Sequence, residues 1–248
     1  MSQNNHFTLY TQNWKMEPVL SLADHFHYLK LDDGQQKRLS EYQLDDSNGQ
    51  LASLNEIVRN NTITRIEMHM ALEGAANLSV FTSCMYMSVY HGNLAPTHFK
   101  LNPFEKPNPE IHLPTTDIVP PIFKEMIATN WDEVDNHLID DLFIAKNVNV
   151  LERVHYFLIG DAMTTFIDKM LEDCSHNILD VKIYAGLDLN KFSNKETISF
   201  TPVLGFKLPI EMINSYQASG SANCLRGEVL LEYSMPCPPA CKPPPSKL

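Results

Sequence analysis

The sequence predicts an α+β protein built from an internal duplication. Its only two tryptophans, Trp14 and Trp131, end the similar segments "TQNW" and "ATNW" and lie 117 residues apart. Two alternating segments, 63–73 and 178–188, follow them at an offset of 115 residues. Apolar residues at every second position are typical of a half-buried strand. We therefore expect two copies packed about a pseudo-twofold axis, each with about three helices followed by a β-hairpin or a three-stranded antiparallel sheet.

The stretch between each tryptophan and its alternating segment predicts helices. In the first copy, apolar residues keep helical spacing over 19–29 and 51–58, and a further helix is expected over about 35–44. In the second copy, the same spacing covers 134–145, 150–158 and 166–171. The last of these follows Gly160 and Asp161, a break and a suitable N-cap.

Each alternating segment predicts the first strand of a hairpin. The second strands, "LSVFTSCMYM" over 78–87 and "TISFTPVLGFKL" over 197–208, share a Phe-Thr pair. A turn with glycine, "GAAN", joins the hairpin of the first copy, whereas the longer "NKFSNKE" joins that of the second. A further strand is expected at "HFKLN" in the first copy and at "EVLLEYS" in the second.

The prolines divide the chain. Of sixteen prolines, six lie in 103–121 and six lie from Pro236 onward. Because proline lacks an N–H and has a restricted φ, such runs end strands and form stiff extended connections. We expect repeat unit 1 over 1–102, a proline-rich linker over 103–121, repeat unit 2 over 122–236 and a proline/cysteine tail over 237–248.

Composition limits the classes of partner. Nineteen basic and thirty acidic residues give a formal net charge of −11, so nucleic acid and anionic membranes are not expected partners. The sequence has no signal-like start and no apolar run near the roughly 20 residues of a spanning helix, which favours a cytoplasmic location. The odd number of scattered cysteines does not suit a secreted disulfide framework: Cys84, Cys174, Cys224, Cys237 and Cys241.

The weak metal candidates are three cysteines and two histidines. Cys237 and Cys241, in "CPPAC", have a spacing close to that of zinc-binding thiols, and Cys224, His91 or His98 would have to complete the site. The cysteine pair leaves three interpretations open: a zinc site, a disulfide or redox pair, and a capping or docking tail. The sequence favours the docking tail, so no cofactor is predicted and zinc is the less favoured alternative.

One strand carries residues suited to acid/base chemistry. Glu67 and His69 lie two positions apart and therefore share a strand face. The corresponding residues of the second copy, Lys182 and Tyr184, have unrelated chemistry. A solvated strand face is the better interpretation of this pair.

The sequence favours a non-catalytic interaction or assembly module over an enzyme. It contains no Gly-x-Ser-x-Gly motif, no phosphate-binding loop and no Gly-x-Gly-x-x-Gly motif. Segment 209–224 and the tail are specific to the second copy, and they are the surfaces expected to meet a protein partner or a second copy of the chain. Two alternatives stay open: a metal-assisted hydrolase with a site between the units, and a small-molecule binding module at the pseudo-twofold axis.

The C-terminal part resembles a known group of proteins. The segments "IYAGLDL" and "ISFTPVLGF", followed by "MPCPPAC", are similar to uncharacterised bacterial proteins that end in a Cys-Pro-Pro-x-Cys-like tail. The resemblance covers about 60 residues and implies no activity, because none is attached to that group.

Overall fold

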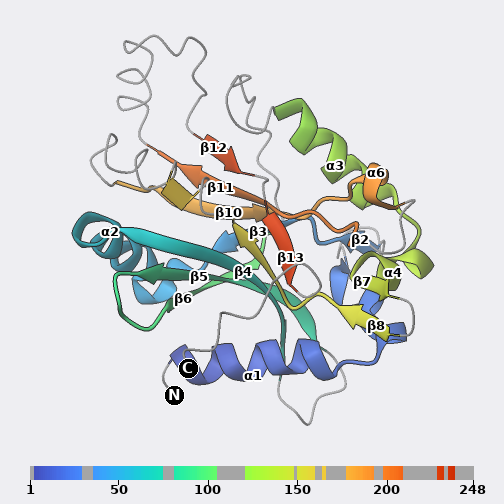
Figure 1. The fold of residues 1–248 in the computed structure, drawn as a ribbon. Helices are drawn as coiled ribbons and strands as arrows, with labels where there is room; N and C mark the ends of the chain where they lie inside the picture. Colours follow the sequence, from blue (N-terminus) through green and yellow to red (C-terminus); the bar gives the residue numbers. More distant parts are fainter. Residues whose placement is uncertain are drawn as a thin grey trace.

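The computed structural model describes most of the chain and is dominated by one sheet. The described residues are 3–29, 36–74, 81–104, 121–147, 150–159, 164–165, 177–192, 198–208, 228–231 and 234–237. Nine antiparallel strands form the sheet, in the order β12-β11-β10-β3-β6-β5-β4-β9-β13 (Figure 1). Their bounds are β3 (Glu41–Leu44), β4 (Ile63–Glu73), β5 (Thr82–His91), β6 (Thr97–Pro103), β9 (Tyr156–Ile159), β10 (Asp180–Tyr184), β11 (Val203–Lys207), β12 (Glu228–Leu231) and β13 (Ser234–Cys237).

Two small hairpins and several helices surround this sheet. The hairpins pair β1 (His27–Leu29) with β2 (Gln36–Arg38), and β7 (Ile144–Asn147) with β8 (Val150–Arg153). The helices are α1 (Gln3–Met16), η1 (Val19–Phe26), η2 (Asp46–Asn48), α2 (Gln50–Asn60), α3 (Pro121–Glu133), η3 (Asn136–Leu138), α4 (Ile139–Leu142) and α6 (Leu189–Phe192). In Figure 1, α1 lies below the sheet and α3 above it. None of these helices combines the length and the apolar character that crossing a membrane requires.

The sheet curls until its two edges come close together. The edge strands β12 and β13 are consecutive in the chain, since β12 ends at Leu231 and β13 begins at Ser234. Three peptide units separate these Cα atoms, which limits their distance to about 11 Å. The sheet is therefore an incomplete barrel rather than a flat layer.

Strands from the two halves of the chain pair with each other at two places in the sheet. β3 from the N-terminal half pairs with β10, where Tyr42 lies opposite Ile183. β9 from the C-terminal half pairs with β4, where Phe157 lies opposite Met68. The numbers 42 and 157, and 68 and 183, each differ by 115. The two halves are therefore intertwined, and each completes the sheet of the other.

The aromatic core contains both tryptophans. Trp14 and Trp131 are fully buried, and the rings of Phe26 and Phe143 stack on each other with centroids 5.2 Å apart. Trp14 meets Phe143 edge-on at 5.2 Å, and Trp131 meets Phe26 in the same way at 5.4 Å. The two tryptophans that mark the copies in the sequence are thus central packing residues.

The predicted fold of three helices and a hairpin per unit is wrong. More of the described residues lie in strands than in helices, and both predicted units contribute to one curled nine-stranded sheet. The helix expected over 35–44 is instead β2 and β3, and the helix expected over 150–158 is β8 and β9. β3 and β9 pair with strands far away in sequence, and such pairing overrides a local helical pattern.

Other expected elements are present in the structure. β4 pairs with β5, and β10 pairs with β11, as the alternating segments predict. α2 covers the helix expected over 51–58. The helix expected over 166–171, linker residues 105–120, and the chain beyond Cys237 lie outside the described residues.

Candidate functional site

A polar cavity lies between the N-terminal half of α1 and the surface formed by β4, β5 and β6. Its volume is about 260 Å³. Side chains from α1, from the start of α2, from the preceding turn and from the three strands line it: His6, Tyr10, Asp45, Asn48, Gln50, Glu73, Tyr86, His98 and Lys100. All nine belong to the N-terminal half of the chain.

The charged side chains of the cavity are paired within its wall. Lys100 Nζ lies 2.7 Å from Glu73 Oε1, and the Tyr10 hydroxyl is also hydrogen-bonded to the Glu73 carboxylate. Asp45 Oδ1 accepts a hydrogen bond from the Ser47 backbone N–H at 3.1 Å, which caps η2. Lys100 and Glu73 therefore compensate each other, while the Asp45 carboxylate is stabilised by hydrogen bonding to the backbone.

Gln50 joins the turn before α2 to β6. Its Oε1 accepts a hydrogen bond from the Lys100 backbone N–H at 2.8 Å, and its Nε2 donates to the Asp45 carbonyl oxygen. The side chain is buried, with 4% exposure. Gln50 therefore holds the position of Lys100 and the shape of this wall.

Tyr86 brings a hydroxyl to the cavity from a buried side chain. The residue is only 3% exposed, and burial raises the pKa of its hydroxyl. Within the described part of the chain, this hydroxyl makes no hydrogen bond, although Tyr10 and Tyr90 both do. The ring is buried but the hydroxyl oxygen opens onto the cavity, so it is available to a bound molecule.

His98 presents a neutral imidazole at the same cavity. Its Nδ1 shares a hydrogen bond of 2.7 Å with the buried Ser88 hydroxyl, and Phe7 stacks on the ring with centroids 3.6 Å apart. Burial, with a further contribution from nearby His69, lowers the pKa of His98 to about 4. Because Nδ1 is engaged, Nε2 is the nitrogen left for a ligand. Ser88 is fully buried, so it orients His98 and is not placed to attack a substrate.

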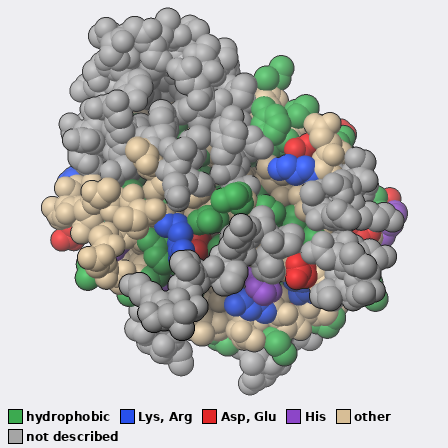
Figure 2. All heavy atoms as spheres, in the orientation of Figure 1, with side chains coloured by type: hydrophobic (Ala, Val, Ile, Leu, Met, Phe, Trp, Pro, Cys, Tyr) green, Lys and Arg blue, Asp and Glu red, His purple; other side chains and the backbone are tan. Residues whose placement is uncertain are grey.

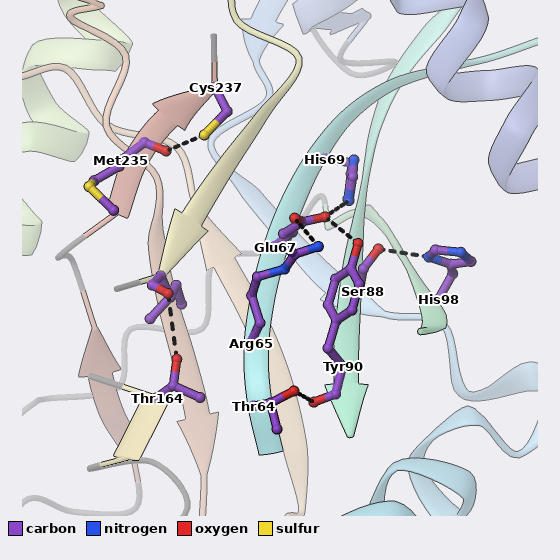
Figure 3. Close-up of polar contacts among 11 residues, drawn as sticks. Thr64, Arg65, Glu67, His69, Ser88, Tyr90, His98, Thr164, Met235 and Cys237 are labelled. Atoms are coloured by element: carbon purple, nitrogen blue, oxygen red, sulfur yellow. Dashed lines mark hydrogen bonds and ion pairs between the residues drawn. The ribbon is translucent and has the colours of Figure 1, made fainter. Parts of the chain in front are cut away.

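A hydrogen-bonded network around Glu67 supports this wall from the neighbouring strand. Figure 3 shows the Glu67 carboxylate surrounded by Arg65, His69 and Tyr90. His69 Nε2 donates to Oε2 at 3.0 Å, the Tyr90 hydroxyl donates to the same oxygen at 2.9 Å, and Arg65 donates to Oε1 at 3.0 Å. Burial alone would raise the pKa of Glu67, but the bond and charge of His69, with Arg65 and Tyr90, lower it.

The Glu67 network corrects the predicted solvated strand face. Glu67 is only 3% exposed, and its carboxylate is paired with three donors. A carboxylate with this many donors is stabilised in its charged form and is a poor proton acceptor. The arrangement suits a structural support more than acid/base catalysis.

A second polar cluster lies where β10, β12 and α3 of the C-terminal half meet β3 of the N-terminal half. Lys182 Nζ lies 2.7 Å from Glu41 Oε1, and the Tyr184 hydroxyl donates to Glu228 Oε1 at 2.7 Å. Lys124 Nζ lies 4.0 Å from the centroid of the Tyr184 ring. Burial lowers the pKa of Lys124 and raises that of Glu228. Two cations and two carboxylates thus compensate one another in this cluster.

Small or apolar residues stand at the positions that the predicted duplication pairs with the cavity groups. Strand register pairs Tyr86 with Lys100 and, on the corresponding strands, Gly205 with Leu230. Ile127 and Leu230 are buried in one apolar cluster. In the predicted alignment of the halves, Ile127 corresponds to Tyr10 and Leu230 to Lys100, which both line the cavity. The hydrogen-bonding groups of the cavity are therefore specific to the N-terminal half.

The predicted metal ligands do not form one site among the described residues. His91, at the end of β5, lies 3.3 Å from the Thr97 hydroxyl through Nε2, and His98 is bonded to Ser88. Cys237, on β13, is buried and forms a disulfide bond. Cys224 and Cys241 lie outside the described residues. In the part of the chain that the structure describes, no three His, Cys, Asp or Glu side chains are grouped to hold a metal ion.

Sequence reasoning named His98 only as a weak metal candidate and did not predict the cavity. Tyr10, Tyr86 and Lys100 come from three separate elements, and nothing in their sequence spacing brings them together. One available signal was the difference between the copies, since Tyr86 aligns with a glycine. Segment 209–224, expected to meet a partner, lies outside the described residues, so that role stays a prediction.

The chain matches no known protein family, no curated protein and no solved structure. Among the described residues that Figure 2 colours, acidic, basic and histidine side chains are interspersed on this face of the molecule. The geometry of the cavity is therefore the basis for inferring a function.

Proposed function

We propose that the protein binds a small polar molecule in the cavity between α1 and the β4, β5 and β6 surface. The observation that carries this proposal is the Tyr86 hydroxyl, which opens onto a polar cavity from an otherwise buried side chain and has no partner among the described residues. A ligand can take the place of solvent at this group, and a hydrogen bond between uncharged groups contributes about 0.5–1.5 kcal/mol.

The cavity is small and its wall is held in place. Its volume of about 260 Å³ lies just below the range of roughly 300–1,000 Å³ for drug-sized ligands. Gln50, the Lys100–Glu73 pair and the Ser88–His98 bond each hold part of the wall. A preformed site loses little conformational entropy on binding, which favours affinity for a small ligand.

Recurring contacts support the duplication predicted from the sequence. Asn13 Nδ2 donates to the Leu72 carbonyl oxygen at 3.0 Å, and Asn130 Nδ2 donates to that of Leu187 at 3.1 Å. We infer that the halves are two versions of one unit, and that the cavity described above belongs to the first. The cytoplasmic location and a protein partner remain predictions from the sequence.

A binding screen with a matched pair of variants tests the proposal. Ligand-observed NMR would compare a library of small polar metabolites on the wild-type protein, Tyr86→Phe and Tyr184→Phe. Both substitutions remove one hydroxyl from a buried side chain and keep the ring, but of the two only Tyr86 lines the cavity.

We expect library members that bind the wild-type protein and Tyr184→Phe and lose affinity for Tyr86→Phe. Circular dichroism and unfolding curves check that both variants are folded. A library in which every binder is indifferent to Tyr86→Phe, or in which nothing binds, would contradict the proposed function.

A further inference from the structure

Two uncharged groups that the strands β5 and β6 bring to the cavity have no partner among the described residues. One is the Tyr86 hydroxyl and the other is His98 Nε2. The pKa of about 4 keeps the His98 imidazole neutral at physiological pH. A hydroxyl can donate and accept, while the neutral imidazole nitrogen does one or the other according to its tautomer.

Lys100 and Glu73 are engaged with each other, and Asp45 adds a second carboxylate to the wall. Lys100 is paired with Glu73 at 2.7 Å, and the side chains are 18% and 41% exposed, respectively. An anionic ligand would meet two carboxylates and would have to displace Glu73 from Lys100, whereas a cationic ligand would have to displace Lys100 from Glu73. Because ion pairs at such partly exposed positions contribute little, a ligand charge gains little here.

We propose that the ligand of this cavity is a neutral small molecule that carries several hydroxyl groups, of the size of a monosaccharide or a cyclic polyol. The inference rests on the proposed function and names its ligand class. Adjacent ligand hydroxyls accept from Tyr86 and bond to His98 Nε2, while a further hydroxyl faces the outer edge of the Lys100–Glu73 pair. A site built to bond a hydroxyl discriminates strongly against analogues that lack it.

The aromatic packing supports this assignment because it holds the imidazole in one orientation. Phe7 stacks on His98 with an interplanar angle of 7° and also meets Tyr86 edge-on at 5.3 Å. One ring therefore holds both neutral groups at the cavity. In the C-terminal half the position of Phe7 belongs to Lys124, which is part of a charged cluster.

Probes sorted by charge test the ligand class. The neutral probes are myo-inositol, D-glucose, D-ribose and glycerol; the anions are glycolate, lactate and inorganic phosphate; the cations are ethanolamine and choline. Titration calorimetry or ligand-observed NMR would measure their affinities for the full-length wild-type chain, Tyr86→Phe and the control Tyr184→Phe.

We expect at least one neutral probe to bind, with an affinity at least ten-fold lower for Tyr86→Phe and unchanged for Tyr184→Phe. Binding of anions or cations that depends on Tyr86, without binding of neutral probes, would overturn the ligand class and leave the proposed function intact. Failure of all three groups, together with an empty library screen, would overturn both. Binding of neutral probes that is equal in all three proteins would show a different site and would also overturn the inference.

Discussion

The indole N–H of Trp14 donates a hydrogen bond of 2.8 Å to the carbonyl oxygen of Val154, 140 residues away. The reciprocal bond joins Trp131 to the carbonyl oxygen of Leu39 at 3.0 Å. Arg153 donates to the Trp14 carbonyl oxygen, and Arg38 donates to that of Trp131. Each half thus packs its tryptophan against the backbone of the other. Because of these contacts, we expect the two halves to unfold together.

Replacing either tryptophan should weaken the whole fold. Trp14→Phe leaves the Val154 carbonyl oxygen without its donor and leaves a cavity in the core. We expect a loss of about 2–4 kcal/mol in the free energy of unfolding, and a similar loss for Trp131→Phe. Urea unfolding followed by circular dichroism measures the free energy of unfolding. Met16→Ala is the control, because Met16 is 72% exposed. A two-step transition in either variant would contradict the intertwined arrangement.

The Glu67 network should make stability depend on pH in the acid range. The folded-state pKa of Glu67 is lower than the ordinary 4.5, so the unfolded chain takes up the proton first. The stabilisation is present above about pH 4.5 and is lost as the pH falls through the folded-state pKa. Glu67→Gln should therefore lower stability at pH 7 by about 1–3 kcal/mol, with a smaller difference from the wild-type protein near pH 3.

Glu56→Gln, on the exposed face of α2, is the matched control for this measurement. It should leave the urea midpoint unchanged across the same pH range. Equal effects of the two substitutions at pH 7 would show that Glu67 does not stabilise the fold through its three donors.

His98 should remain neutral well below the pH at which histidine ordinarily titrates. Its pKa of about 4 lies under the ordinary 6.5, so the unfolded chain binds the proton first as the pH falls. The stability contributed by neutral His98 therefore declines between about pH 6.5 and 4. Long-range ¹H–¹⁵N NMR spectra would follow the ring nitrogens and identify the tautomer. A midpoint near 6.5 for His98 would contradict its burial against Phe7.

The Lys182–Glu41 pair should behave as a buried ion pair. The two side chains are 13% and 9% exposed, respectively, and their charged atoms lie 2.7 Å apart. Lys182→Met leaves the Glu41 carboxylate buried without its partner, and we expect a loss of about 3–5 kcal/mol. The double variant Glu41→Gln with Lys182→Met should recover part of this loss.

The exposed pair of His137 and Asp135 provides the comparison for that measurement. Their side chains are 72% and 63% exposed, so Asp135→Asn should change stability by less than about 1 kcal/mol. Losses of equal size from Lys182→Met and Asp135→Asn would contradict the buried character of the Lys182 pair.

The sequence predicted the long, regularly alternating segments correctly but missed the short strands β3 and β9. β4 alternates over eleven residues, Ile63–Glu73, and both it and its partner β5 were predicted. β3 and β9 have four residues each and carry no comparable local signal. Their strand conformation comes from neighbours on both sides, which local periodicity does not contain.

The candidate site shows the same division. Glu67 and His69 share a strand face because strand residues two apart point the same way, and the sequence predicted this. Arg65 and Tyr90 complete the network through strand pairing and packing, so their roles became visible only in the structure. The cavity around Tyr86 depends on how α1 crosses the sheet, for which the chain carries no local pattern.

By itself, the sequence determined the two tryptophan-marked segments, the long hairpin strands and the acidic balance of charge, because periodicity and composition are local properties. The tertiary structure decided that the halves exchange strands, that the sheet curls, and that Tyr86 and His98 meet at one cavity. Those features depend on contacts between residues distant in the chain, such as Trp14 with Val154. Their free energy is gained only when both halves fold together.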